Sequence, residues 1–327
     1  MNGVPEAIDS TPAVEIRDLR VDYGDNVAVD GISLEIPPGE IFGLVGPNGA
    51  GKTSTFKVLA TLMEPTYGEV LLCGFDIAEK RGRVPRLLGY MPDLAPVPSD
   101  LKVWEFLDLF ASSHGVKRKE RREKIEEALV HVQLTDRRED QCKSLSRGMK
   151  QRLALAKTML HEPRVMLLDE PASGMDPVSR AALRRTLQTV ASRGTTVLIS
   201  SHILTELSAM CTSVGIMSKG TVVASGKIED VLSRFSEQKV LSVCLSGESA
   251  RAREIFEAHP QISKVQMEGA TLSGSFEGDE NAQVALLAAL VHASCPVQTF
   301  SEKSRDIESI ILDLDKPTIE TPLTEDV

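Results

Sequence analysis

The sequence predicts an α/β fold with a helical insertion, followed by a small α+β domain. Three short apolar runs, Ile41–Val45, Val165–Leu168 and Thr196–Ser201, have the length and composition of buried parallel strands. Residues 100–161 are instead charged and helix-rich. After residue 226, segments typical of strands and helices follow in the order β-α-β-β-α-β. Strands separated by helices indicate a sheet covered by helices, with the charged block inserted into it.

The elements divide the chain into four expected parts. Residues 1–13 are polar and expected to be flexible, and residues 14–226 form the large α/β domain, with strands and turns over 14–45 and a helical subdomain over about 94–161. Residues 227–315 form the accessory α+β domain, and residues 316–327 are an acidic, Pro/Thr-rich tail expected to be disordered. Short helices are expected at Ile228–Phe235 and Asp306–Leu314.

Composition excludes several classes of protein. The 327 residues carry a net charge of −10, which argues against broad nucleic-acid binding. The basic stretch Val116–Lys124 is interpreted as the solvated face of a helix, because an apolar stripe follows it at Ile125, Ala128, Leu129 and Val132. Five scattered cysteines indicate reduced thiols. Because neither a membrane-spanning stretch nor a signal peptide is visible, we expect a cytoplasmic protein.

A phosphate-binding loop follows the first apolar run. The octapeptide GPNGAGKT, Gly46 to Thr53, fits the pattern G-x-x-x-x-G-K-[ST] and lies between a predicted strand and a predicted helix. Glycines let backbone N–H groups turn towards phosphate oxygens, and the helix N-terminus adds its positive dipole. In this pattern Lys52 places a charge on the β- and γ-phosphates, and the Thr53 hydroxyl binds Mg²⁺.

Two acids end the second apolar run. Asp169 at the tip of the strand can hold Mg²⁺ directly or through water, and Glu170 comes next, where it can polarise an attacking water. Many strands end in Asp-Glu, but together with the phosphate loop the pair predicts nucleotide hydrolysis.

Further motifs identify a family. Leu145–Arg152 (LSRGMKQR) is similar to the signature of ABC ATPases, usually LSGGQ, and Pro171–Pro177 (PASGMDP) resembles their D-loop. Ser200-Ser201-His202 matches the ABC switch histidine, and Tyr23 fits the aromatic residue that stacks on adenine. The resemblance covers about residues 14–226 in the right order and spacing.

The resemblance implies a mechanism that needs two such subunits. They pair head to tail, and each ATP lies between one phosphate loop and the other subunit's signature, with His202 holding the γ-phosphate and Glu170 as the base. Catalysis is thereby assigned to Glu170, His202 and Lys52, and the Mg²⁺ site to Thr53, Asp93 and Asp169. The expected nucleotide-binding set comprises Tyr23, Gly46, Pro47, Asn48, Gly49, Ala50, Gly51, Lys52, Thr53, Ser54 and Asp93, and from the opposite subunit Ser146, Arg147, Gly148 and Asp176.

Two positions depart from the family pattern. Asp93 stands where the family usually has Gln, which adds a negative charge near the γ-phosphate and leaves in doubt how this loop senses a transmembrane partner. Arg147 stands where a Gly is usual and brings a positive charge towards the opposite nucleotide. Neither replaces a residue expected to carry the chemistry.

The expected function is that of a transport motor. A polytopic membrane subunit would dock on the helical subdomain, with Leu101–Ala111 lining the groove, although aromatic residues such as Trp104, Phe106 and Phe110 there are more often core residues. The chain would then be peripheral on the cytoplasmic face of the membrane. One nucleotide domain followed by a small C-terminal domain resembles the export-type branch of the family.

Two alternatives remain open at this point. A soluble ABC ATPase could act on ribosomes or DNA, but such proteins usually carry two nucleotide domains, coiled coils or zinc pairs that this chain does not show. A regulatory half-site that binds ATP without hydrolysing it is the second alternative, and Asp93 is its only support.

Overall fold

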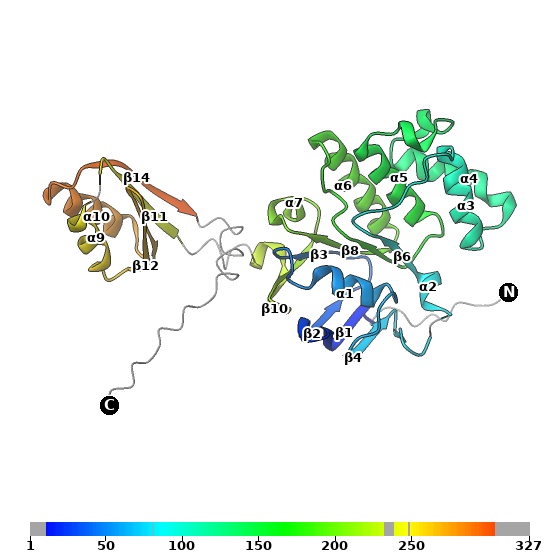
Figure 1. The fold of residues 1–327 in the computed structure, drawn as a ribbon, viewed down its shortest axis with the longest axis horizontal. Helices are drawn as coiled ribbons and strands as arrows, with labels where there is room; N and C mark the ends of the chain where they lie inside the picture. Colours follow the sequence, from blue (N-terminus) through cyan, green and yellow to red (C-terminus); the bar gives the residue numbers. More distant parts are fainter. Residues whose placement is uncertain (1–10, 81, 232–238, 248, 305–327) are drawn as a thin grey trace. The chain divides into compact units, whose positions relative to one another are not determined.

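The structure is a computed structural model that describes residues 11–80, 82–231, 239–247 and 249–304 (Figure 1). Contacts divide the chain into two compact units, Met1–Ile228 and Glu229–Val327. The predicted helix Asp306–Leu314, the predicted tail and residues 1–10 lie outside the described residues; of the predicted helix Ile228–Phe235, residues 228–231 are described and helical. No helix in the described ranges is both long enough and apolar enough to cross a bilayer.

The first unit is built around a six-stranded sheet. Its strand order is β10-β9-β3-β8-β7-β6, and all neighbours run parallel except β9 and β10. The strands are β3 (Ile41–Val45), β6 (Leu88–Met91), β7 (Val165–Leu168), β8 (Thr196–Ser201), β9 (Ser213–Ser218) and β10 (Thr221–Lys227). The three runs predicted as buried strands are confirmed as β3, β7 and β8, and every residue in them is buried.

The strands predicted over residues 14–45 are confirmed, but the sequence did not predict that the first two of them form a second sheet with residues 67–76. Its strands β1 (Val14–Tyr23), β2 (Asn26–Ile36), β4 (Tyr67–Leu72) and β5 (Phe75–Asp76) are antiparallel, in the order β2-β1-β4-β5. Helix α1 (Lys52–Leu59) buries Phe56, Val58 and Leu59 in one apolar core with residues of both sheets. The phosphate loop therefore leads into a helix that is fixed by two sheets (Figure 1).

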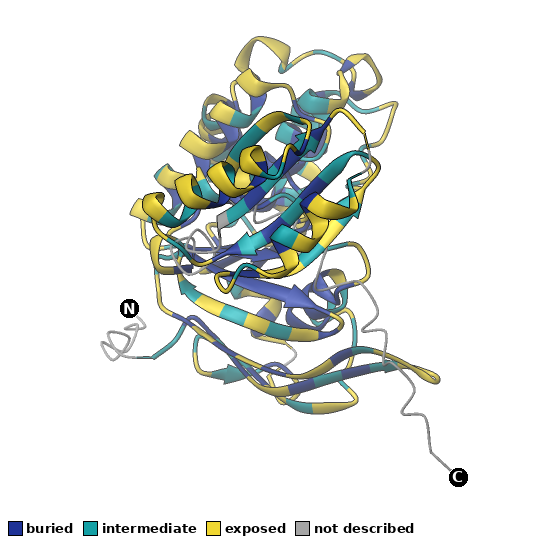
Figure 2. Cartoon of the chain, turned by 90° about the vertical axis from the view of Figure 1, so that its left-hand side faces the viewer, coloured by how far each residue is buried: buried dark blue, intermediate teal, exposed yellow. Residues whose placement is uncertain are grey.

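Helices form the rest of the first unit. They are α2 (Val84–Leu87), α3 (Val103–Ser113), α4 (Arg118–His131), α5 (Arg147–Met159), α6 (Pro177–Ser192) and α7 (Leu204–Ser208), with 3₁₀ turns at Thr135–Arg137 and Cys142–Ser144. The apolar stripe predicted on α4 is confirmed, because Ile125, Ala128 and Leu129 are buried. Figure 2 shows the buried residues gathered on the strands and on one side of the helices.

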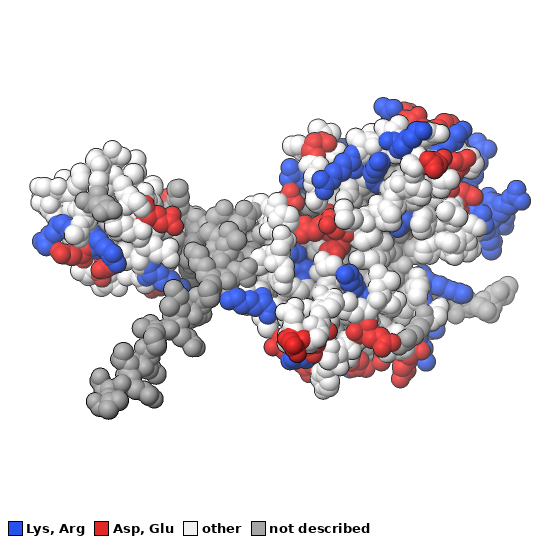
Figure 3. All heavy atoms as spheres, viewed as in Figure 1, with Lys and Arg blue, Asp and Glu red and all other residues white. Residues whose placement is uncertain are grey.

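The basic stretch of α4 is part of a mixed charged surface. Arg121 lies 3.7 Å from Asp108, and Lys124 lies 2.8 Å from Glu162. Figure 3 shows basic and acidic side chains mingled over the upper part of this unit. The interpretation of the stretch as one face of an amphipathic helix is therefore confirmed.

The second unit has the predicted β-α-β-β-α-β order. Its elements are β11 (Lys239–Leu245), α9 (Ala250–Glu257), β12 (Ile262–Glu268), β13 (Thr271–Phe276), α10 (Glu280–His292) and β14 (Val297–Ser304). The sheet is antiparallel in the order β12-β13-β11-β14, and its core contains Phe256, Phe276, Leu286 and Leu290. Strand β14 runs four residues beyond the predicted end at Phe300, because it stays paired with β11 as far as Ser304.

Candidate functional site: a phosphate-loop pocket

The phosphate loop needs glycine at two positions for reasons of space. It runs from the end of β3 to Lys52 at the start of α1. A Cβ atom at Gly46 would lie 2.2 Å from the carbonyl oxygen of Met217, and one at Gly51 would lie 2.4 Å from that of Ala28. Gly51 also has a φ of 103°, which L side chains rarely adopt. Larger residues at these points would displace β2 or the end of β9 from the loop.

Lys52 is held over this loop. Its Nζ donates to the carbonyl oxygens of Gly46, at 2.6 Å, and Pro47, at 3.0 Å. Burial lowers the pKa of Lys52, and the carboxylates of Glu170 and Asp169 oppose that effect. The two carboxylates favour the charged form of Lys52, and a charged ammonium group beside the loop can bind an anion that enters the pocket.

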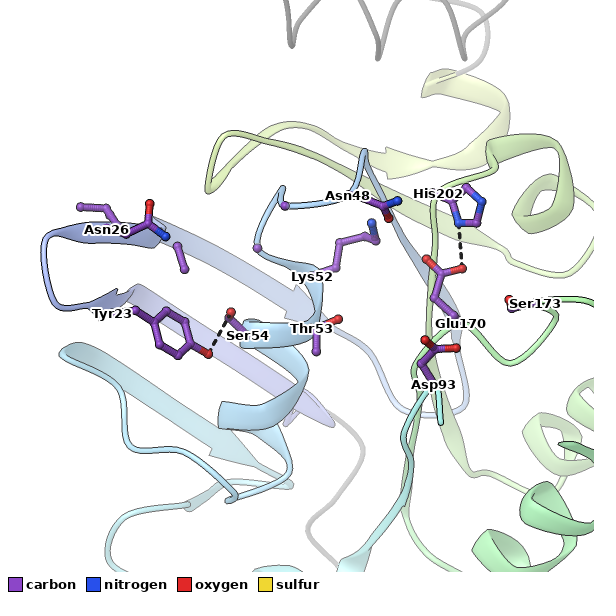
Figure 4. Close-up of a pocket in the computed structure, with 14 residues that line it drawn as sticks. Tyr23, Asn26, Asn48, Lys52, Thr53, Ser54, Asp93, Glu170, Ser173 and His202 are labelled. Atoms are coloured by element: carbon purple, nitrogen blue, oxygen red, sulfur yellow. Dashed lines mark hydrogen bonds and ion pairs between the residues drawn. The ribbon is translucent and has the colours of Figure 1, made fainter. Parts of the chain in front are cut away.

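A pocket of about 510 Å³ opens beside the loop. The predicted site residues that line it are Tyr23, Asn48, Gly49, Gly51, Lys52, Thr53, Ser54, Asp93, Glu170 and His202. Figure 4 shows them arriving from β1, the loop, α1 and the ends of β6, β7 and β8. This convergence at the carboxyl ends of parallel strands is where open α/β sheets bind ligands.

Glu170 and His202 face each other across the ends of β7 and β8. The Nδ1 atom of His202 lies 3.0 Å from Oε2 of Glu170, as the dashed line in Figure 4 marks. Burial raises the pKa of Glu170, while His202 and Lys52 act to lower it. Glu170 has a φ of 49°, in the left-handed region that is costly for a residue with a side chain. A partly buried carboxylate with a raised pKa can accept a proton from water.

Asp169 lies behind this pair and does not line the pocket. Only 1% of the residue is exposed, and its Oδ1 accepts a hydrogen bond from the hydroxyl of Ser200. Ser200 Oγ also accepts from the backbone N–H of Glu170, at 2.9 Å. Asp169 therefore fixes the ends of β7 and β8, and reaches a metal in the pocket only through an intervening ligand or a change of rotamer.

Tyr23 stands at the other end of the pocket. The residue is 46% exposed at the end of β1. A hydrogen bond of 3.3 Å joins its hydroxyl to that of Ser54, and the hydroxyl also donates to Met63 Sδ at 3.5 Å. An exposed ring held at one edge offers a face on which a planar base can stack.

Asp93 faces the pocket from the loop after β6. Its backbone oxygen accepts a 3.3 Å hydrogen bond from Nε2 of Gln151, which lies on α5. The loop that carries this carboxylate is therefore tied to the helical block. Thr53 and Asp93 supply the oxygen atoms that Mg²⁺ prefers.

Four expected residues lie outside the pocket lining. Ser146 caps α5, where its Oγ accepts from the N–H of Met149, and Arg147 and Gly148 follow in the first turn. Asp176 caps α6 and accepts from the N–H groups of Val178 and Ser179, each at 2.9 Å. These hydrogen bonds lower the pKa of Asp176. The three loop residues Gly46, Pro47 and Ala50 are also outside the lining, because they shape the loop from behind.

The pocket also contains residues that the sequence did not identify. They are Asn26, Val27, Ala28 and Ser173. Asn26 pairs with Tyr23 across the tight β1–β2 hairpin, so the turn at Gly24-Asp25 was the signal that could have found it. Ser173 is placed by a turn after Glu170, and no sequence signal distinguishes it from its neighbours.

Comparisons with known proteins agree with this pocket. The ABC transporter family model matches residues 29–173. Nod factor export ATP-binding protein I of Cupriavidus metallidurans is 33% identical over 222 residues, which are 68% of this chain and 73% of that protein. Linearmycin resistance ATP-binding protein LnrL of Bacillus subtilis is 30% identical over 234 residues, 72% of this chain and 75% of that protein. The probable multidrug ABC transporter ATP-binding protein YbhF of Escherichia coli is 34% identical, but the match spans only 40% of it.

Solved structures give the same result. One described as the ATP-binding subunit of an ABC transporter superposes with a TM-score of 0.63 and 30% identity, covering 68% of this chain and 93% of that one. CbiO1 from Clostridium perfringens, described as part of the ABC transporter complex CbiONQ, has a TM-score of 0.62 and 25% identity, with 68% and 92% coverage. The chain therefore belongs to the ATP-binding proteins of ABC transporters, a family that binds and hydrolyses ATP.

Proposed function

We propose that this chain is the motor of an ABC exporter, with Lys52, Glu170 and His202 as its catalytic residues. The observation that carries the proposal is that all three line one pocket with the phosphate loop. Lys52 would bind the β- and γ-phosphates when its Nζ leaves the carbonyl oxygens of the loop. Tyr23 would stack on the adenine at the other end.

Hydrolysis needs a water aligned with the γ-phosphate. Glu170 takes the proton of this water as its oxygen bonds to the γ-phosphorus, and the bond from that phosphorus to the β–γ bridging oxygen breaks. His202, 3.0 Å from Glu170, orients the carboxylate and holds the γ-phosphate through its other ring nitrogen. A carboxylate and a phosphate both accept hydrogen bonds, so His202 fills both roles at once only with an N–H on each ring nitrogen, that is, as a protonated imidazole.

Mg²⁺ fits this pocket together with a nucleotide. Among the described residues, no three His, Cys, Asp or Glu side chains gather closely enough to hold a metal alone. Thr53 and Asp93 would hold the ion beside the phosphate oxygens, and Asp169 would act through water. The bound ion would neutralise charge on the phosphates.

A second nucleotide-binding subunit would complete each site. Ser146, Arg147, Gly148 and Asp176 lie outside the pocket lining of their own chain, as a site shared between two chains requires. The N-terminus of α5 would present N–H groups to the γ-phosphate bound by the other subunit. Hydrolysis would then depend on pairing.

The membrane subunit is proposed to be a separate polytopic protein docked on the helical block. Leu94 and Leu109 are exposed there, by 81% and 55%, while Phe106 of the expected groove is buried in the core. The names of the relatives, which include Nod factor export and linearmycin resistance, favour export. We further propose that unit Glu229–Val327 is an accessory domain and that the chain lies on the cytoplasmic face of the membrane.

Copurification tests the transporter proposal. The tagged chain is expressed in its native host, membranes are separated from cytosol and solubilised gently, and stoichiometric partners are identified. We expect a polytopic membrane protein with the wild-type chain, and the same protein with a Lys52→Met variant, because docking does not need ATP chemistry. A chain that stays in the cytosol with ribosomes or DNA would favour the soluble ABC ATPase instead.

A further inference from the structure

The side chain of Arg147 packs on Gly174 of the same chain. A methyl group at Gly174 would lie 3.0 Å from Cζ, 3.1 Å from Nε and 3.2 Å from Nη1 of Arg147. Because three guanidinium atoms are nearly equidistant from that point, the plane of the group lies face-on against the glycine. Gly174 has a φ of 68° and no side chain, which leaves room for this contact.

A second contact joins the same two segments. A Cβ atom at Gly148, the next residue of α5, would be 3.6 Å from the hydroxyl oxygen of Ser179 in the first turn of α6. That hydroxyl donates to Oδ2 of Asp176 at 2.7 Å. The first turn of α5 therefore lies close to both the loop before α6 and the start of α6 itself.

The loop between Glu170 and Asp176 contains two overlapping turns. The N–H of Ser173 donates to the carbonyl oxygen of Glu170, and the N–H of Met175 to that of Ala172, both at 3.1 Å. The two turns share Ala172 and Ser173, so consecutive hydrogen bonds connect Glu170 to Met175. Ser173 lines the nucleotide pocket and Gly174 carries the guanidinium, so a shift of Arg147 reaches the pocket through two neighbouring residues.

The chemistry of arginine suits this contact. A planar guanidinium can pack one face on a surface while its N–H groups stay free in the plane. The side chain of Arg147 is exposed and makes no hydrogen bond or ion pair with the described residues. A glycine, the residue usual for the family at this position, would leave Gly174 without the guanidinium group that packs on it.

We infer that Arg147 is a positioning residue that couples the two ATP sites of the proposed dimer. Its backbone lies in the signature turn that meets the nucleotide of the partner, and its side chain holds the loop that begins at its own Glu170. ATP docking on the signature therefore shifts the loop of the other site. The coupling rests on the proposed function, whereas the packing on Gly174 does not.

Hydrogen exchange tests the packing in the nucleotide-free full-length chain. We expect the amide N–H groups of Ser173 and Met175 to exchange several-fold faster in Arg147→Ala, because the loop loses its cover. Arg147→Lys keeps the positive charge but lacks the planar guanidinium group, so its exchange rates are expected to match those of Arg147→Ala. Lys143→Ala, which removes an exposed charge near the signature, is the control and should match wild type. Unchanged exchange in Arg147→Ala would overturn the inference.

Dependence of hydrolysis on ATP concentration tests the coupling in the complex captured with the tagged chain. We expect a sigmoidal curve for wild type, and a loss of coupling of roughly 5-fold or more in Arg147→Ala and Arg147→Lys. If the wild-type curve is sigmoidal and both variants keep it, the coupling role is wrong although the proposed function stands. If the wild type shows no two-site behaviour, the paired-site proposal fails, whatever the exchange data show.

Wild-type behaviour of Arg147→Lys in both assays, with defects only in Arg147→Ala, would also overturn the inference. That result would assign the effect to charge near the partner nucleotide and not to packing on Gly174. The lysine variant therefore separates the two physical explanations in the same experiment.

Discussion

The imidazole of His202 and the carboxylate of Glu170 meet at 3.0 Å, although 32 residues separate them in the sequence. Parallel pairing of β7 with β8 brings the two strand ends together; His202 directly follows β8, and Glu170 lies two residues beyond the end of β7. The alignment of neighbouring strands thus places a base beside the group that orients it. Removing either residue should therefore affect the same chemical step.

Glu170→Gln is expected to lower kcat by about 10²- to 10⁴-fold, the range for loss of a general base. Gln keeps the size of the side chain and can still hydrogen-bond His202, so ATP binding should stay near wild type. Single-turnover hydrolysis and nucleotide binding would be measured on the same preparation. Full hydrolysis by this variant in the assembled complex would exclude Glu170 as the base and revive the regulatory half-site.

As the pH is lowered, kcat should begin to fall at a pH above the usual pKa of a glutamate side chain. The pKa of Glu170 is raised above 4.5 by burial, and a base works only when it is deprotonated, so kcat is lost as pH falls through this raised value. His202 is one of the groups that lower this pKa. His202→Ala should therefore move the acid limb to higher pH, besides lowering kcat.

A pH profile of kcat for wild type and His202→Ala checks this direction. His131→Ala is a matched control, since His131 is another histidine paired with a glutamate, at 3.4 Å from Glu127, far from the pocket lining. If the acidic limb of the kcat profile lies at the same pH in His202→Ala as in wild type, the titration of Glu170 does not determine that limb.

Lys52→Met should weaken ATP binding by about 10- to 100-fold, because it removes a hydrogen bond between charged groups and such a bond contributes a free energy of this size. Methionine keeps the length of the side chain but cannot neutralise phosphate. Lys57→Met on the same helix is the control, because Lys57 does not line the pocket. Titration with a fluorescent ATP analogue gives both affinities, and equal losses in the two variants would indicate general damage to α1.

The sequence predicted most reliably the elements whose burial is complete. The bounds of β3, β7 and β8 agree with prediction, because a strand buried on both faces is apolar throughout and stops at the first functional residue. The strands over residues 14–45 were predicted, but the pairing of β1 with β4 was not, because it joins Val14 to Leu72 and distant pairing leaves no local signal. The end of β14 was missed because its last residues are polar and held only by β11.

For the site, the sequence patterns identified the functional residues, and the structure showed which way their side chains point. The motifs brought Lys52, Glu170 and His202 to one pocket as expected. They gave no hint that Asp169 turns towards Ser200, since that depends on the neighbouring strand. Nor could they reveal Ser173 or the packing of Arg147 on Gly174, which depend on turn geometry and on the approach of α5 to the loop before α6.

Asp93→Asn should raise the Mg²⁺ concentration needed for half-maximal hydrolysis by roughly 10-fold. The amide is similar in size but a weaker ligand for a hard cation. Asp100→Asn, an exposed aspartate in the same segment, is the control. If the Mg²⁺ requirement is unchanged and ATP binds more tightly, Asp93 acts by repulsion and is not a ligand.

Phe256→Ala should destabilise the second unit by about 3–5 kcal/mol and leave ATP binding unchanged. Phe256 is 0% exposed in a core made only of residues from that unit, so truncation leaves a cavity there. Phe56→Ala is the counterpart in the first unit, where Phe56 is also 0% exposed and lies on the helix after the phosphate loop. Calorimetry of the full chain with and without ATP separates the two effects, since ligand binding stabilises only the unit that holds the ligand. We expect two unfolding transitions. ATP should raise the Tm of the transition of the first unit, and Phe56→Ala should lower it. Phe256→Ala should lower the Tm of the transition of the second unit. A single transition that responds to all three changes would show that the two units unfold as one, and would contradict an independent accessory domain.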